Sequence, residues 1–176
     1  MKLLTEIFHH QGLNLISGSV VTRNAVRAII FDQDQLFMIY SKKNGDYKFP
    51  GGGLKKGEDH RTALIREIKE ESGVENVIIE KAFGKVIEYD LPIEEEYDLF
   101  KMTSRYFLCN IGSVFGIQRL DPYEIDLGFT ACWVSIDQAL NTNRALLREK
   151  YSEMPRWVQR ETFVLEKLKN WSYAVD

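Results

Sequence analysis

The chain contains 176 residues, of which 44% are hydrophobic and 28% are charged, and its formal net charge is −3. This composition is typical of a globular domain, and the small acidic excess argues against a general binder of duplex nucleic acid, which needs a basic surface. No apolar run approaches the roughly 18 residues of a membrane-spanning helix, so we expect no membrane partner. The first residues lack an apolar stretch followed by a small-residue cleavage site, which predicts a cytoplasmic protein.

The first half of the chain predicts short strands and one helix. Asn44-Gly45 is typical of a hairpin turn, and Asp59 and Gly73 are suited to cap the two ends of the helix. A glycine-rich loop at residues 51–58 precedes that helix. The expected strands cover residues 4–21 (as one or two short strands), 25–31, 35–41 and 47–50.

The second half predicts further strands and an amphipathic helix near the end. The expected strands cover residues 76–91, 100–111 and 130–136, a loop covers 119–129, and helices cover 135–143 and 154–171. Because strands and helices do not alternate strictly, the pattern favours an α+β fold with a mixed sheet over a doubly wound fold. We find no repeat or linker, so we expect one domain over residues 1–176.

The predicted helix carries a cluster of glutamates near its C-terminus. A helical wheel predicts a carboxylate face formed by Ala63, Glu67, Glu70 and Glu71. The opposite, apolar face is formed by Leu64, Ile65 and Ile68. The glutamates repel one another, and the helix dipole disfavours anions at this end. A bound divalent cation would offset both effects, and clustered carboxylates suit Mg²⁺ or Mn²⁺. The alternative is a solvated face whose glutamates pair with Arg66 and Lys69.

The spacing around this cluster matches a longer pattern, G-x5-E-x7-R-E-U-x-E-E-x-G-U, where U is aliphatic. The specified positions are filled by Gly52, Glu58, Arg66, Glu67, Ile68, Glu70, Glu71, Gly73 and Val74. The chain thus resembles the Nudix hydrolase superfamily (MutT-like). The flanking strands extend the resemblance over a core of about residues 20–140, which leaves an N-terminal strand extension at 1–19 and a C-terminal helical segment at 141–176.

The resemblance implies an α/β/α sandwich with the motif as a loop–helix–loop, and it implies roles for the motif residues. Glu70 and Glu71 would be direct metal ligands. Glu67 would be a third ligand, or the group that orients or deprotonates the attacking water. The carbonyl of Gly51 or Gly52 would complete the ligand set. Catalysis would further depend on an ion pair between Arg66 and Glu58 that holds the loop on the helix.

Other site residues are expected outside the motif. Members of the family often use a further acid in a later loop, for which we favour Glu124, with Asp126 second. Arg27, Lys48 and Lys55 are candidates for substrate phosphate binding. For base stacking we consider three aromatic residues, namely Phe8, Tyr47 and Phe49, whereas Trp157, Phe163 and Leu165 are expected to be packing residues.

The resemblance also implies the reaction. The family hydrolyses a pyrophosphate bond in a small-molecule nucleotide, which favours a nucleoside diphosphate linked to another group, such as a nucleotide sugar or ADP-ribose. The alternatives are a nucleoside triphosphate, a dinucleoside polyphosphate or a 5′-triphosphate RNA end, and a non-catalytic nucleotide-binding sensor. Tyr89 and Pro92 both lie where subfamilies carry a marker residue, so the substrate stays open. A homodimer is also expected, since family members often dimerise.

Overall fold

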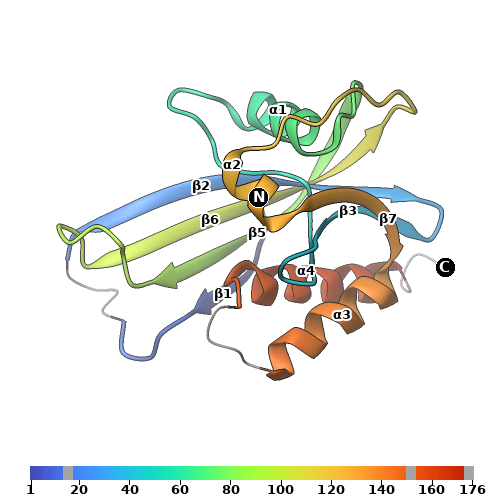
Figure 1. Cartoon of the computed structure of the whole chain (residues 1–176). Helices are drawn as coiled ribbons and strands as arrows, with labels where there is room; N and C mark the ends of the chain where they lie inside the picture. Colours follow the sequence, from blue (N-terminus) through green and yellow to red (C-terminus); the bar gives the residue numbers. More distant parts are fainter. Residues whose placement is uncertain (14–17, 150–153, 173–176) are drawn as a thin grey trace.

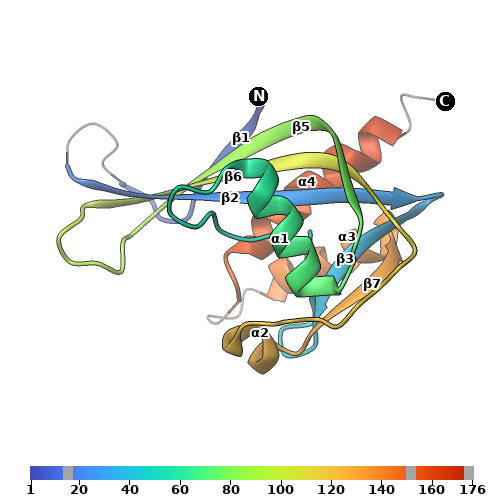
Figure 2. The same ribbon diagram turned by 90° about the horizontal axis from the view of Figure 1, so that it is seen from above.

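The computed structural model describes residues 1–13, 18–149 and 154–172. Its strands are β1 (Leu3–Phe8), β2 (Val20–Asp32), β3 (Gln35–Ser41), β4 (Asp46–Lys48), β5 (Val77–Asp90), β6 (Leu99–Ile111) and β7 (Phe129–Ser135). Its helices are α1 (His60–Ser72), α2 (Pro122–Leu127), α3 (Ile136–Glu149) and α4 (Trp157–Ser172). Helix α1 lies on one side of the sheet, and α3 and α4 lie on the other (Figures 1 and 2). The predicted α+β fold, an α/β/α sandwich with a mixed sheet, is confirmed.

The sheet mixes parallel and antiparallel pairs. Its order is β1-β5-β6-β2-β3-β4, and β7 pairs with β3. Strands β1 and β5 are parallel, as are β2 and β6, whereas the other pairs are antiparallel. Strand β2 pairs with β6 from Val20 to Ile30 but pairs with β3 only at their shared hairpin. The edge of β2 is therefore free along most of its length.

The glycine-rich loop fills this free edge. The Ala28 and Val26 N–H groups donate to the carbonyls of Pro50 and Gly52, at 2.8 and 3.0 Å, and Leu54 N–H donates to the Asn24 carbonyl at 3.0 Å. A Cβ at Gly51 would lie 2.1 Å from a β2 carbonyl oxygen, and the φ of Gly51 is +135°, so only glycine fits there. The loop is thus held against the sheet by backbone pairing.

Two apolar layers fix α1 and the last two helices on the sheet. Along β2, Ala28 and Ile30 face α1, whereas Ile29 faces the layer that contains Leu140 of α3 and Leu165 of α4. This alternation is that of a strand buried on both faces. The side chains of α4 form part of the core, so the helical segment at the C-terminus is integral to the sandwich.

One expectation about the elements needs correction. The predicted loop at 119–129 contains α2, which begins with Pro122 after Asp121. The core boundary expected at about residue 140 stays a prediction, and it falls within α3, which continues to Glu149. Residues 14–17, 150–153 and 173–176 of the predicted terminal segments lie outside the described residues. Within the described part of the chain, no helix is long and apolar enough to cross a membrane.

Candidate active site

Helix α1 has the ends that the sequence predicts. The Asp59 carboxylate accepts from the N–H groups of Arg61 and Thr62 at 2.8 and 3.1 Å. At the other end, Gly73 has a φ of +76°, and its N–H donates to the Lys69 carbonyl. Both caps satisfy backbone groups that the helix leaves unpaired. The caps therefore set the position at which the glutamates leave the helix.

The three glutamates of α1 differ sharply in exposure. The side chains of Glu70, Glu67 and Glu71 are 36%, 13% and 1% exposed, respectively. The helical wheel was wrong to place Glu71 opposite the packed face, because Glu71 is buried beside Leu64 and Ile68 while Ile65 is only half-buried. The buried position is tolerated because residues distant in sequence supply partners for the carboxylate.

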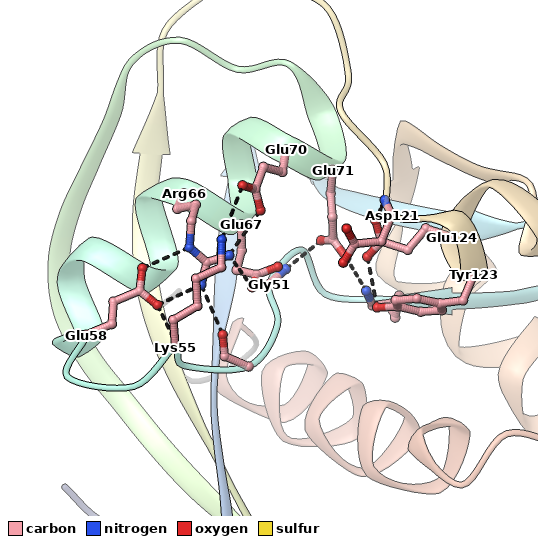
Figure 3. Close-up of polar contacts among 12 residues, drawn as sticks. Gly51, Lys55, Glu58, Arg66, Glu67, Glu70, Glu71, Asp121, Tyr123 and Glu124 are labelled. Atoms are coloured by element: carbon pink, nitrogen blue, oxygen red, sulfur yellow. Dashed lines mark hydrogen bonds and ion pairs between the residues drawn. The ribbon is translucent and has the colours of Figure 1, made fainter.

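Arg66 ties the glycine-rich loop to the helix. Its Nε and Nη2 atoms donate to the two carboxylate oxygens of Glu58 at 2.8 and 2.7 Å, and Nη2 also donates to the Gly53 carbonyl at 3.1 Å. Its Nη1 atom donates to Glu67 at 2.6 Å and to Glu70 at 3.0 Å (Figure 3). The expected Arg66–Glu58 ion pair is present, and one guanidinium faces three carboxylates.

Electrostatics separate the roles of these carboxylates. The hydrogen bonds from Arg66 hold the pKa of Glu58 at about 2. Burial raises the pKa of Glu67 above its usual range, although Arg66 opposes this effect. Glu58 is thus a fixed anion, whereas Glu67 is a carboxylate of increased basicity.

Glu71 is held by a second set of partners. One carboxylate oxygen pairs with the Lys48 ammonium, and the other accepts the Gly51 N–H at 2.7 Å. The Lys48 Nζ atom also lies 4.6 Å from the centre of the Phe129 ring. Lys48, a predicted phosphate ligand, therefore has its charge engaged inside the protein.

Of the two later acids, Glu124 lies near the helix and Asp126 does not. Glu124 is 4% exposed, and its oxygens accept from the Tyr123 hydroxyl and the Asp121 N–H, both at 2.9 Å (Figure 3). Burial, and then the nearby charge of Glu71, raise the pKa of Glu124. Asp126 instead pairs with Lys43 at the surface. Of the two predicted acids, Glu124 is therefore the one that lies beside Glu71, and its role stays a prediction.

A cleft of about 760 Å³ runs between the glycine-rich loop, β2 and the start of α4. All three predicted phosphate-binding residues, Arg27, Lys48 and Lys55, line this cleft. Arg27 is 7% exposed, and its Nε atom has no hydrogen-bond partner among the described residues. The cleft therefore holds a buried cationic group with free hydrogen-bonding capacity.

The aromatic residues of the cleft are not those that the sequence suggested. Phe8, Tyr47 and Phe49 pack against Tyr89, Tyr40 and Tyr106, respectively, away from the cleft lining. The lining aromatic residues are Tyr123, Phe129 and Trp157. From the sequence, Trp157 is expected to be a packing residue, because its helix is amphipathic. Hydrophobic periodicity does not show that this helix begins at the cleft, so it could not predict that Trp157 lines it.

The donor set suits a hard divalent ion at Glu67 and Glu70. Both carboxylates are near the cleft, and a Cβ on Gly52 would lie 2.3 Å from a Glu67 oxygen, so the loop backbone lies against this carboxylate. Mg²⁺ is commonly held by one or two carboxylates plus substrate phosphates and water. Within the described ranges, however, no three His, Cys, Asp or Glu side chains form a metal-binding group. The Gly52 carbonyl, a predicted ligand, accepts the Val26 N–H.

The fold and the site define an enzyme of the pyrophosphohydrolase class. The chain belongs to the Nudix family, since the model of the NUDIX domain matches residues 21–163. Members of this family generally use divalent metal ions.

Individual relatives agree with this assignment. An RNA pyrophosphohydrolase of Campylobacter jejuni subsp. doylei is 27% identical over 153 residues, which cover 81% of this chain and 96% of the relative. An RNA pyrophosphohydrolase of Nitratiruptor sp. is 37% identical over 68 residues, or 37% of this chain and 44% of the relative. The solved structure of a Nudix hydrolase from Nitrosomonas europaea aligns with a TM-score of 0.53 and 21% identity, over 80% of this chain and 88% of that one.

Proposed function

We propose that this chain hydrolyses the pyrophosphate bond of a nucleoside diphosphate linked to another group, such as a nucleotide sugar or ADP-ribose, with Mg²⁺ or Mn²⁺. The observation that carries the proposal is the length of the cleft and its mixed lining. Thr22 and Asn24 give the lining polar groups, whereas Tyr123, Phe129 and Trp157 give it aromatic rings. A base stacked on one of these rings and a sugar bound by the polar groups would place the pyrophosphate beside α1.

The dimensions of the cleft support a substrate with two ends. Along β2, a rise of about 3.3 Å per residue separates Thr22 from Arg27 by about 17 Å. Both residues line the cleft. A mononucleotide would fill only part of that length, so the remaining part suits a second group joined through the pyrophosphate.

Glu67 and Glu70 are the residues that would hold the metal ion. When bound, such an ion neutralises phosphate charge and lowers the pKa of its water. Arg66 orients both carboxylates through the hydrogen bonds that its Nη1 atom donates to them. As an alternative to direct ligation, Glu67 would accept a proton from the attacking water, a role that its burial favours by raising its pKa.

Arg27 would bind a substrate phosphate. Its guanidinium is buried, its Nε atom is unpaired among the described residues, and its charge acts on Glu67. A guanidinium matches the geometry of phosphate oxygens and forms paired hydrogen bonds with them. Lys55, which is exposed, lies 3.9 Å from Glu70 and lines the cleft, would add positive charge for the substrate phosphates.

A second candidate substrate is a 5′-triphosphate RNA end. It is favoured by the names of the relatives from Campylobacter and Nitratiruptor. Arg23 and Lys55, which line the cleft, would then contact the RNA backbone. The net charge of −3 argues against this substrate, since RNA binding depends strongly on basic charge.

The homodimer and the single-domain organisation stay predictions.

The test is a panel of substrates with products identified by mass. The panel contains ADP-ribose, nucleotide sugars, dinucleoside polyphosphates, nucleoside triphosphates and a 5′-triphosphate RNA oligonucleotide, each with Mg²⁺ or Mn²⁺. We expect fastest turnover of a nucleoside diphosphate-linked compound, with a nucleoside monophosphate as one product. Faster release of pyrophosphate or phosphate from the RNA would replace the first candidate by the second, and background rates on every compound would contradict both.

A further inference from the structure

Lys48 is a buried lysine at the end of β4, two residues before Pro50. Its side chain is 7% exposed. Lysine is almost never buried to this degree unless its ammonium is paired. Here the ammonium pairs with Glu71 and lies over the face of the Phe129 ring. Lys48 is thus a fixed positive charge under the glycine-rich loop.

The Lys48 ammonium pairs with Glu71, a carboxylate that the Nudix motif would assign as a metal ligand. Glu71 accepts from Lys48 on one oxygen and from the Gly51 N–H on the other. Both oxygens of this 1% exposed side chain are therefore engaged within the protein. Glu67 and Glu70 differ, because they share one guanidinium nitrogen and have more exposed side chains.

The charge of the same ammonium acts on a second buried carboxylate. The charges of Lys48 and Glu71 both act on Glu124, which is 4% exposed. Figure 3 shows the Glu71 and Glu124 side chains directed toward each other, on the side of the site away from Glu58. Two buried carboxylates directed toward each other need a nearby cation or a shared proton, and here the Lys48 ammonium supplies the nearby positive charge.

We propose that Lys48 is a built-in cation that occupies the position of a second metal ion at Glu71 and Glu124. The chain then carries divalent ions only on the Glu67 and Glu70 side. Lysine suits this role because its ammonium is a compact point charge with three donors. The inference rests on the proposed function in one respect, since Glu67 and Glu70 hold the metal that supports hydrolysis. Lys48 is accordingly a positioning residue that limits the number of metal ions.

The test counts Mn²⁺ bound to the full chain without substrate, from the electron paramagnetic resonance signal of free Mn²⁺. The Lys48→Met variant frees Glu71 and Glu124, so we expect it to bind one more Mn²⁺ per chain than the wild type. Combining Lys48→Met with Glu124→Gln should remove the additional ion. Lys43→Met is the matched control, because Lys43 also pairs with a carboxylate, at 2.7 Å, but at the surface. Its Mn²⁺ count should equal that of the wild type.

An unchanged count in folded Lys48→Met, with folding checked by circular dichroism, would overturn the proposal. A second measurement decides if that variant does not fold. Glu124→Gln in the otherwise wild-type chain should leave the count unchanged, because Lys48 already occupies the position. A lower count would identify Glu124 as a metal ligand and would overturn the proposal. The count needs no turnover, so a failure of the substrate panel does not affect it.

Discussion

Replacing Arg66 by methionine should destabilise the loop–helix unit. Arg66 is 18% exposed, and the change removes hydrogen bonds to Glu58, Glu67, Glu70 and the Gly53 carbonyl. Breaking a buried ion pair costs about 3–5 kcal/mol. Because Arg66 is partly solvated, we expect its loss to lower the free energy of unfolding by about 3 kcal/mol. For a chain of this length, 1 kcal/mol shifts the melting temperature by about 2–4 °C, so we expect a fall of about 6–12 °C.

The assay is thermal unfolding followed by circular dichroism, in metal-free buffer. Arg61→Met is the matched control, because Arg61 lies exposed on the first turn of the same helix. An exposed substitution of this kind should change stability by no more than about 0.5 kcal/mol. Hydrogen exchange should also show faster exchange in residues 51–58 of the Arg66 variant. Equal melting temperatures for the two variants would refute the structural role of Arg66.

Two further predictions concern buried charges. Glu71→Gln leaves Lys48 buried without a carboxylate at its closest contact, so the free energy of unfolding from urea denaturation should fall by about 3–5 kcal/mol, and an unchanged urea midpoint would contradict the pairing. Burial would raise the pKa of Glu88, but Arg160 and His9 outweigh it and hold the pKa at about 2. Because this lies below the ordinary value of about 4.3, ionised Glu88 stabilises the fold above about pH 5, and the contribution is lost as the pH falls toward 2. Glu88→Gln should therefore make stability less dependent on pH in this range; the same acid dependence in variant and wild type would show that Glu88 contributes nothing.

Local chemistry explains what could be predicted from the sequence. The caps at Asp59 and Gly73 depend on residues next to the helix, and both are where the sequence places them. The pair between Arg66 and Glu58 is a short-range contact of the motif. The missed helix α2 had a detectable signal, since Asp121-Pro122 followed by Glu124 has the spacing of a capping box with proline at the first helical position.

Long-range partners explain what could not be predicted. The burial of Glu71 depends on Lys48, which lies 23 positions earlier and reaches it only after the loop folds onto β2. In the same way, Arg160 of α4 pairs with Glu88 of β5, and no periodicity in either segment predicts that contact. A helical wheel ranks residues by polarity alone, so it cannot anticipate a carboxylate that is buried beside a distant cation.

The most direct test of the central claim is the metal dependence of hydrolysis in three forms of the chain: wild type, Glu70→Gln and Glu75→Gln. Glu75 is the control, since its carboxylate pairs with Lys69 at the surface at 2.9 Å. With the fastest substrate of the panel, wild type and Glu75→Gln should require Mg²⁺ or Mn²⁺ and lose turnover in chelator. Glu70→Gln should be at least about 100-fold slower while folded, since metal catalysis supplies several kcal/mol. Turnover that persists in chelator, or that is unchanged by Glu70→Gln, would contradict the account.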